Sequence, residues 1–473
     1  MLTYQLKKLP GMPLYESLYR CIRGDILSGK LKPGEKLPSK RALAENLEVS
    51  KITVENAYNQ LLSEGYIRSK EKTGYYVEQV ARPAPPVAPS MGEEPAVEEA
   101  RLDLTGGAAV KFPFSVWSKL QRDVMLDYGE QLLRPMPNRG ILELRQAISD
   151  HLAAFRGLHA KPENILIGAG TDFLYNLLIQ LLGREKIYAV EEPGYGKIRR
   201  IYAAGGVSCV SAAMDERGVR PDSLGDARVL HISPSHHFPT GLVTSAQRRR
   251  ELLDWAIRQD GYIIEDDYDS EFRFHAHPMS AMQSMEGGER VIYMNSFSKS
   301  LAPSIRISYM VLPEGLMARF QRELGFYACT VPSFEQYTLA RFLSRGHFEK
   351  HINRMRKFYQ TRRNKVLRLL EGCAYAPRLT VLEQDAGLHF LLKVDTDLSD
   401  PSLCEMLAGC GIKVYPLSHY YHSEGITDTH TLVVCYAGAE EKQLEEALER
   451  LAGSAGLPAA KRPPCVKGAG KNL

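Results

Sequence analysis

Near the N-terminus, the hydrophobic positions follow a helical period. Over residues 14–26 an apolar side chain recurs every four positions, and Gly29 follows, which predicts one amphipathic helix with its stop. After a turn, Ser39 can cap a short helix, and Ser50 can cap another over residues 51–63. Two short helices joined by a tight turn, the second better exposed, are typical of a helix-turn-helix.

A β-hairpin is predicted after these helices. Residues 66–68 and 75–77 are β-like and flank the basic tip Lys70-Glu71-Lys72-Thr73-Gly74. Such a hairpin could lie as a wing on a phosphate backbone or in a minor groove. Residues 1–78 hold 13 Lys and Arg against nine Asp and Glu, which accounts for the whole formal charge of +4. We therefore predict a winged helix-turn-helix over residues 1–78, with a purely structural three-helix module as the alternative.

Two segments lack the periodicity of packed elements. Residues 79–102 contain five prolines and almost no large apolar side chains, which predicts a partly extended linker. At about 3.3–3.6 Å per extended residue, this linker is long enough to reach a neighbouring subunit. Residues 454–473 are predicted to form a disordered basic tail.

Beyond the linker, strand-like and helix-like runs alternate. The short apolar runs of buried-strand type are residues 165–167, 187–190, 229–232, 262–264 and 291–293. The runs with helical period are residues 143–155, 172–182 and 245–258. This order predicts an α/β domain with a largely parallel sheet, whose ligands bind at the carboxyl ends of the strands.

We assign this large domain to residues 103–335 and a smaller domain to residues 336–453. The smaller domain has helical stretches near 337–371 and 438–452 and a strand-like run at 388–392.

The loops that follow the predicted strands carry the candidate chemistry. Gly168-Ala169-Gly170-Thr171 precedes a helix, so amides and a hydroxyl could approach a phosphate there; a turn needed only for backbone geometry is the alternative. Tyr195 offers a ring on which a cofactor could stack. In residues 265–269 a carboxylate could pair with a pyridinium nitrogen, and a phenol could bond a ring oxygen. A calcium or magnesium loop is the competing interpretation, but the EF-hand spacing is missing, and no metal site is predicted.

Lys299 stands at the end of the apolar run that begins at Val291. It lies in the small polar turn Ser296-Phe297-Ser298-Lys299-Ser300. An amine in this place suits a Schiff base to an aldehyde cofactor, and the hydroxyls with Arg306 suit its phosphate. A solvated loop lysine is the alternative.

Composition narrows the class of protein. The 473 residues, 44% hydrophobic and 25% charged, fit a globular protein of several domains. The eight cysteines form no CxxC pair or repeated spacing, so neither a zinc site nor a disulfide framework is indicated. No run approaches 18 apolar residues, and we expect a cytoplasmic protein without a membrane span.

The N-terminal head resembles the winged-helix DNA-binding domain of GntR-type regulators. The phrases PGEKLPSKRALAENLEVSKITVENAYNQLLSEGYI and TGYYV carry the resemblance. It implies that DNA is contacted by Ser39, Arg41, Lys51, Thr53 and Asn56 and by a wing tip of Lys72, Thr73 and Gly74. Glu55 departs from the basic residue often found at its position.

The body resembles the fold-type I aminotransferases that use pyridoxal 5'-phosphate, over roughly residues 103–452. The glycine turn, the loop tyrosine, Asp-x-Tyr, and a lysine with a downstream arginine follow in the same order. With the GntR-type head, the whole chain is similar to the MocR subfamily of bacterial regulators, as IEDDYDSEF and SFSKSLAPSIRISYMVLP indicate.

The resemblance implies a role for each site residue. Lys299 would form the Schiff base, Asp266 would sit on the pyridine nitrogen, Tyr268 near the ring hydroxyl and Tyr195 over the ring face. The phosphate would be held by Arg306, Ser296, Ser298, Ala169, Gly170 and Thr171. His237 stands where an amide is common; it could donate to the ring hydroxyl, with a charge expected to vary near pH 6 to 7.

Two departures bear on the ligand. Val433 stands where aminotransferases usually present an arginine for the substrate carboxylate, and Lys197 near a position where amino-acid sensors often carry one. The missing bidentate clamp favours sensing of the cofactor itself, with Lys197 as the candidate effector contact.

The leading hypothesis is a homodimeric regulator that binds double-stranded DNA under the control of pyridoxal 5'-phosphate or an amine or amino-acid effector. A catalytically active aminotransferase with an appended head is the alternative, and a DNA-binding scaffold with an inactive body is a third hypothesis.

Overall fold

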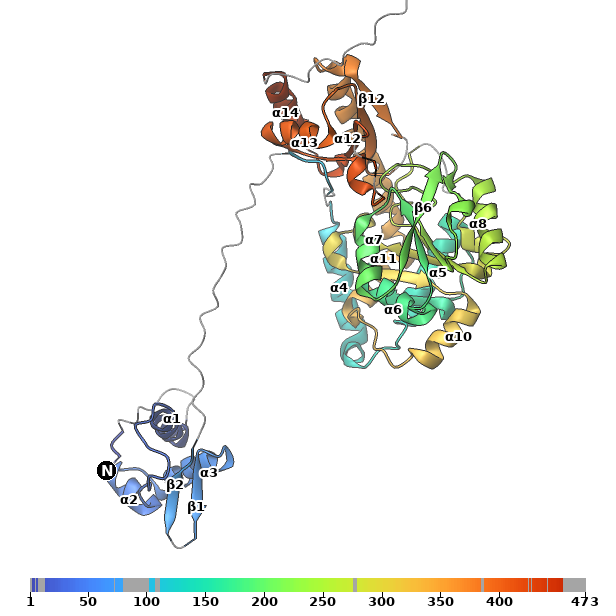
Figure 1. Ribbon diagram of the computed structural model, residues 1–473. Coiled ribbons are helices and arrows are strands. Elements are labelled where there is room, and N and C mark those ends of the chain that lie inside the picture. Colours follow the sequence, from blue (N-terminus) through green and yellow to red (C-terminus); the bar gives the residue numbers. More distant parts are fainter. Residues whose placement is uncertain are drawn as a thin grey trace, which may run out of the picture. The chain divides into compact units, whose positions relative to one another are not determined.

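The computed structural model describes residues 2–4, 6, 13–71, 73–79, 102–106, 111–274, 279–383, 387–423, 425–426, 428–439 and 441–453. The chain divides into two compact units, Met1–Glu98 and Glu99–Leu473 (Figure 1). The predicted tail, most of the predicted linker and Lys72 of the wing tip lie outside the described residues.

The first unit is a three-helix domain with a hairpin. Its elements are α1 (Leu14–Leu27), α2 (Lys40–Asn46), α3 (Lys51–Ser63), β1 (Ile67–Lys70) and β2 (Gly74–Val77), the two strands being antiparallel. Ser39 Oγ accepts from the Ala42 amide, and Ser50 Oγ accepts from the Thr53 amide, so both predicted helix caps are confirmed. Leu18 and Ile22 of α1 pack on Val54 and Leu61 of α3.

The second unit is built on an eight-stranded sheet of order β4-β11-β10-β9-β8-β5-β6-β7. Its strands are β4 (Ile165–Gly168), β5 (Tyr188–Glu192), β6 (Cys209–Asp215), β7 (Gly218–Val219), β8 (Val229–Ile232), β9 (Tyr262–Asp266), β10 (Val291–Ser296) and β11 (Ser308–Val311). The pairs β6-β5, β5-β8, β8-β9 and β9-β10 are parallel, whereas β11 is antiparallel to both β10 and β4. The predicted α/β domain with a largely parallel sheet is therefore confirmed, and the carboxyl ends of β4, β5, β8, β9 and β10 meet at one edge.

Helices cover both faces of this sheet. They are α4 (Phe114–Tyr128), α5 (Leu142–Arg156), α6 (Thr171–Leu182), α7 (Gly196–Ala204), α8 (Ala246–Arg258), α9 (Phe297–Ser300), α10 (Glu314–Glu323) and α11 (Ser333–Ser344). Alternate strand residues enter different cores: Ile292 packs with α6, α7 and α10, whereas Val291 packs with α8 and Tyr293 with α4, α5 and α11.

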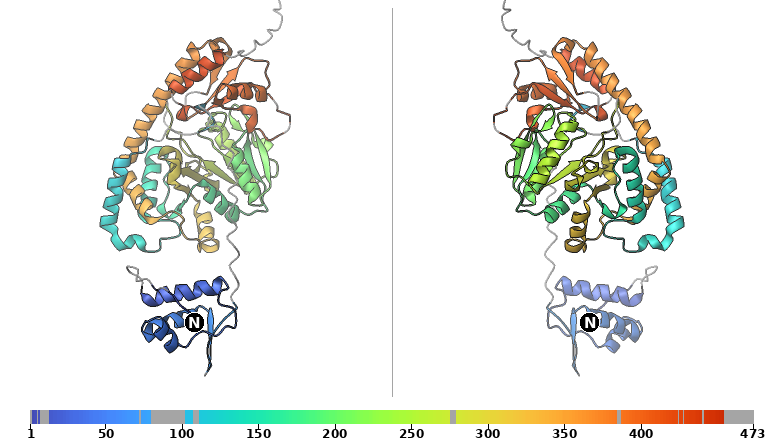
Figure 2. Two further views of the ribbon diagram at one scale, coloured as in Figure 1. Left: turned by 90° about the vertical axis from the view of Figure 1, so that its left-hand side faces the viewer. Right: turned by 90° about the vertical axis from the view of Figure 1, so that its right-hand side faces the viewer.

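A smaller antiparallel sheet of order β12-β13-β16-β15 forms a second layer system in this unit. Its elements are α12 (His347–Gly372), β12 (Leu379–Leu382), β13 (Phe390–Val394), α13 (Asp400–Gly409), β14 (Ile412–Lys413), β15 (Tyr415–Pro416), β16 (Thr431–Val434) and α14 (Glu441–Gly453). The helical stretch predicted near 337–371 is two helices, because Gly346 with φ 70° separates α11 from α12. Figures 1 and 2 show the long α12 joining the two layer systems, in contact with α11 and α14.

The strand β3 (Leu102–Asp103) pairs in parallel with β14 in a separate two-stranded sheet, which the sequence did not indicate. Leu102, the last residue of the predicted linker, is therefore already part of a strand that lies beside β14, before the chain continues into α4. Among the residues placed by the structure, no helix is both long and apolar enough to cross a bilayer.

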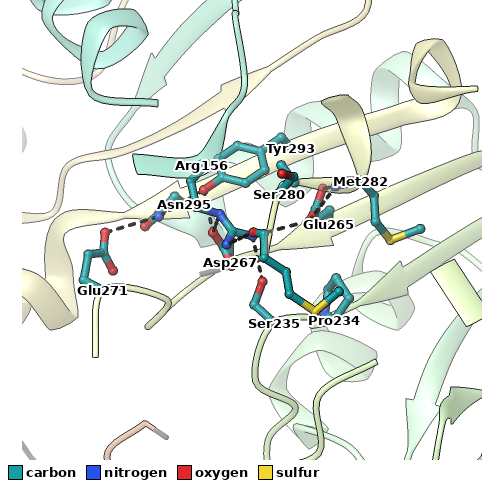
Figure 3. Close-up of polar contacts among 12 residues, drawn as sticks. Arg156, Pro234, Ser235, Glu265, Asp267, Glu271, Ser280, Met282, Tyr293 and Asn295 are labelled. Carbon is teal, nitrogen blue, oxygen red and sulfur yellow. Dashed lines mark hydrogen bonds and ion pairs between the residues drawn. The ribbon is translucent and has the colours of Figure 1, made fainter. Parts of the chain in front are cut away.

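A buried ion-pair network lies beneath the carboxyl end of β9 (Figure 3). Arg156, from the last turn of α5, places Nε 2.9 Å from Asp267 Oδ2 and donates from Nη2 to Ser235 Oγ at 2.8 Å. Glu265 lies between Arg156 and Arg249, with its carboxylate 3.9 and 4.0 Å from the two guanidinium groups, and accepts from the Met282 amide. Both carboxylates and both arginines are at most 2% exposed. Each charged group therefore needs its ion-pair partners to offset the free-energy cost of removing it from water.

We expect Arg156→Met to destabilise the second unit strongly. Removal of one partner leaves Asp267 and Glu265 under-compensated in the interior, which typically costs about 3–5 kcal/mol. Both tryptophans, Trp117 and Trp255, lie in this unit, so their fluorescence during denaturant unfolding reports it alone. Arg250→Met on the surface of α8 is the control and should leave the unfolding midpoint nearly unchanged. An Arg156→Met protein as stable as wild type would contradict the importance of this network.

Candidate functional site

A cavity of about 450 Å³ opens at the carboxyl edge of the large sheet. It is lined by the sequence-predicted residues Thr171, Tyr195, Lys197, Asp266, Tyr268, Ser296, Ser298, Lys299 and Arg306. These side chains come from the last residues of β9 and β10 and from the segments that follow β4, β5, β9 and β10, because parallel strands bring their carboxyl ends together.

Asp266 forms the acidic wall of the cavity. Its Oδ2 accepts a hydrogen bond from the Tyr175 hydroxyl and lies 3.5 Å from His231 Nε2. The other carboxylate oxygen, Oδ1, is buried without a hydrogen-bond partner among the described residues. A buried acceptor of this kind requires a donor, and a protonated pyridine nitrogen supplies one.

Tyr268 stands beside Asp266 with a hydrogen-bonded support behind it. Its hydroxyl lies 3.4 Å from His236 Nδ1, which in turn lies 2.9 Å from Asp269 Oδ2. Burial, with a smaller contribution from Asp269, raises the pKa of Tyr268 well above its usual value. The phenol therefore remains protonated and can donate to an oxygen of a bound ring.

Lys299 lies in α9, a single helical turn that starts where β10 ends. Ser296 caps this turn by accepting from the Ser298 amide, and its hydroxyl also donates to Ser298 Oγ and accepts from Ser308 Oγ, both at 2.9 Å. The hydroxyl cluster fixes the turn, and with it the lysine, at the carboxyl end of β10. Cys435 also lines the cavity, and burial raises the pKa of its thiol to about 11, so the thiol is a neutral neighbour of the amine.

The turn from β4 into α6 approaches Arg306 closely. Gly170 has φ 90°, and a Cβ at this position would clash with Arg306 Nη2. Glycine is therefore required here both by the backbone conformation and by the guanidinium. Arg306 itself has a left-handed φ of 49°, which aims its side chain at the N-terminus of α6.

The amides of this turn are less available than the sequence predicted. The Ala169 amide donates to Thr330 Oγ1 at 3.0 Å, and the Gly170 amide donates to the Gly168 carbonyl at 2.9 Å. Of the three predicted phosphate contacts in this turn, Thr171 is the one that lines the cavity. The phosphate roles of Ala169 and Gly170 remain predictions.

Lys197, the predicted effector contact, is already paired. Its Nζ lies 2.8 Å from Asp172 Oδ2, the same oxygen that lies 3.5 Å from Arg306 Nη2. Asp172 was not predicted from the sequence, where it reads as an ordinary acidic residue of a first helical turn.

His237 behaves differently from the sequence expectation. It is 1% exposed and does not line the cavity; its Nδ1 lies 2.7 Å from Thr240 Oγ1. Burial lowers its pKa to about 3, so the expectation that its charge varies near pH 6 to 7 is wrong. A second lining acid that the sequence missed, besides Asp172, is Glu191, whose pKa is raised to about 8 by burial. Its Oε2 accepts from the Ser233 amide and lies 3.5 Å from His237 Nε2.

The predicted DNA-contacting residues that the structure describes lie on α2 and its cap, on α3 and in the hairpin. Lys51 and Asn56 are exposed, and Arg41 is exposed with an ion pair to Glu45. Several of the side chains predicted to contact DNA also make hydrogen bonds within the unit. Ser39 and Thr53 take part in the helix caps, and Thr73 Oγ1 donates to the Lys70 carbonyl. Gly74, with φ 118°, begins β2.

Glu55, the departure noted in the head, is held by an ion pair. Its carboxylate lies 2.7 Å from Lys40 Nζ of α2, and the hydrogen bond from this ammonium lowers the pKa of Glu55. The carboxylate is therefore ionised and paired within the unit.

Comparisons with known proteins agree with both units. The family model for aminotransferase class I and II matches residues 103–451, and the model for bacterial regulatory proteins of the gntR family matches residues 14–77. The chain is 35% identical to the uncharacterized HTH-type transcriptional regulator YdeL of Bacillus subtilis (strain 168), over 95% of this chain and 98% of that protein. It is 32% identical to the probable rhizopine catabolism regulatory protein MocR of Rhizobium meliloti, over 93% of each chain.

A solved structure of Pyrococcus horikoshii kynurenine aminotransferase, in complex with PMP, covers 74% of this chain and 90% of its own, with a TM-score of 0.65 and 24% identity. This likeness shows the fold of the second unit. With relatives that match head and body along nearly their whole length, the chain belongs to the MocR subfamily of GntR-type transcriptional regulators, in which a DNA-binding head is fused to an aminotransferase-type body.

Proposed function

We propose that this chain is a transcriptional regulator whose sequence-specific DNA binding is controlled by pyridoxal 5'-phosphate, or by an amine or amino acid, in its aminotransferase-like unit. The observation that carries the proposal is the convergence of Lys299, Asp266, Tyr268 and Arg306 on one cavity. When bound, the cofactor supplies an aldehyde for amines and an electron-withdrawing ring.

The residues that would hold the cofactor divide by their chemistry. Lys299 would attach it covalently, Asp266 Oδ1 would accept from its ring nitrogen, and Tyr268 would donate to its ring oxygen. Arg306 would bind the phosphate together with the hydroxyls of Thr171, Ser296 and Ser298. Tyr195, which is 51% exposed at the mouth of the cavity, would cover the ring face.

The described lining residues favour the cofactor itself, or an amine without a carboxylate, as the effector. Lys197 is paired with Asp172, and Arg199 lies 3.5 Å from Glu192 and donates to Ser211 Oγ at 2.7 Å. Lys299 and Arg306 are assigned to the cofactor, so no further lining cation in the described part of the chain is left for a carboxylate.

The wall of the cavity next to Tyr195 is apolar. Phe238 packs edge-on against Tyr195 and Tyr420, with ring centroids 5.9 and 5.1 Å apart, and Val433 is buried in the same cluster. An aromatic or aliphatic group of an amine would gain contact here, whereas a carboxylate would lose hydration.

We further propose a homodimer in which ligand binding changes the spacing of paired heads. Phe114, Leu126, Leu133 and Phe326 are each more than 70% exposed on the second unit, and packing against another chain would remove such side chains from water. The predicted linker is long enough for a head to reach a partner subunit. Ligand control then requires a coupling free energy, commonly about 1–3 kcal/mol, between the cavity and the DNA site.

The covalent role of Lys299 is tested by absorbance. Wild-type protein passed through gel filtration after exposure to pyridoxal 5'-phosphate should keep a cofactor band that Lys299→Ala lacks, because the other lysine that lines the described cavity, Lys197, is paired with Asp172. Lys197→Ala, in the same cavity, is the matched control and should keep the band. A Lys299→Ala protein with the wild-type band would refute the assignment.

DNA binding through the head is tested by Arg41→Ala. If this exposed guanidinium contacts a phosphate, its loss should weaken operator binding and lower the slope of log affinity against log salt by about one. Arg20→Ala on α1 is exposed but lies outside the predicted DNA face and should bind like wild type. Unchanged affinity of Arg41→Ala would contradict the placement of α2 on DNA.

The effector class is tested with a matched pair of probes. Phenethylamine should alter the cofactor band and the operator affinity of wild type, whereas phenylalanine, which adds a carboxylate, should be at least tenfold less effective. An equal response to both probes would contradict the proposed absence of a carboxylate clamp. Steady multiple-turnover transamination of an amino acid would instead favour the alternative function, an active aminotransferase.

A further inference from the structure

The exposed face of α3 is a narrow stripe of four residues. Ile52, Asn56, Asn59 and Ser63 recur at i, i+4, i+7 and i+11 and are all exposed, as is Lys51 at the start of the helix. The opposite face is buried in the unit and consists of Val54, Ala57, Tyr58 and Leu61. The stripe therefore contributes nothing to the core of this unit and is available to a ligand.

Ile52 is an unusual member of this stripe. Its side chain is 67% exposed in the first turn of α3, and it is the one large hydrophobic residue that is exposed among the described residues of the first unit. The N-terminal residues of the second helix in a helix-turn-helix lie against base edges in the major groove. An aliphatic group there has one apolar target on the bases, the 5-methyl group of thymine.

The rest of the stripe is uncharged. α3 contains no arginine, and its only lysine is Lys51 at the first position. Glu55 lies one turn from Ile52, but its charge is paired with Lys40 of α2 at 2.7 Å. The commonest base contact, an arginine or lysine on guanine, is therefore unavailable along the centre of this face, whereas an asparagine such as Asn56 can bond adenine bidentately.

We propose that α3 reads A·T pairs, with Ile52 against a thymine methyl group and Asn56 on an adenine of each operator half-site. This inference rests on the proposed DNA binding and specifies the base chemistry that the head recognises. The charges that flank the stripe, Lys51 and Arg41, would serve the phosphates and set the position of the helix.

The test removes the 5-methyl group of thymine and leaves the rest of the base pair unchanged. Operators are first selected from random DNA duplexes with the full-length protein, loaded with pyridoxal 5'-phosphate. Each thymine of the selected site is then replaced in turn by deoxyuridine, and affinities are compared for wild type, Ile52→Val and Ile52→Ala.

We expect one thymine in each half-site at which deoxyuridine weakens wild-type binding about fourfold, the effect of one buried methyl group. Ile52→Val should keep part of this discrimination, and Ile52→Ala should bind both duplexes equally. Because Ile52 is exposed, Ile52→Ala should fold normally, which circular dichroism can verify. Asn56→Ala should relax the preference for adenine at a nearby pair.

The outcomes separate this inference from the proposed function. A selected operator without any methyl-sensitive thymine, or with the same sensitivity in Ile52→Ala, overturns the role of Ile52 and leaves DNA binding intact. A selection that enriches no sequence overturns both. A dominant guanine requirement opposite Asn56 would also contradict A·T recognition by this helix.

Discussion

The end of β9 depends on the buried ion pair between Arg156 and Asp267. Consecutive strand residues point to opposite faces, so Glu265 and Asp267 turn towards the two arginines while Asp266 turns towards the cavity. The sequence offers two adjacent aspartates with no local means of choosing between them. The choice is made by Arg156, more than 100 residues earlier in the chain, because only one of the two carboxylates can meet its guanidinium group.

The same contrast between local and distant determinants explains how much the sequence could predict. The caps at Ser39 and Ser50 and the strand ends near Lys299 and Asp266 are local features, read from a few neighbouring residues, and the structure has them as predicted. The pairing of β3 with β14 joins residues some 310 positions apart, and the hydrophobic pattern around either strand did not predict it. The burial of His237 and the capture of the Ala169 amide by Thr330 are also long-range effects, and they changed the expected chemistry of those residues.

Glu192 links the rim of the cavity to the small sheet system. It accepts from the His422 and Ser423 amides at 2.8 and 2.5 Å, and the Gly194 amide donates to the Tyr420 carbonyl at 2.9 Å. The loop that carries Tyr195 is thus tied to the segment that precedes β16. A group that packs on Tyr195 therefore contacts a loop that is hydrogen-bonded to both layer systems of the unit. A ligand at this place can bind two conformations of the unit with different affinities, and such a difference shifts the population between them.

The position of β3 determines where the linker joins the second unit, which the sequence did not predict. The Leu102 amide donates to the Gly411 carbonyl, the Leu104 carbonyl accepts from the Cys435 amide, and Thr105 and Gly106 form part of the cavity wall beside Cys435. The described residue nearest the linker, Leu102, thus lies in a strand whose next residues line the cavity. The covalent path from the cavity wall to the linker runs through β3 and Leu104 alone.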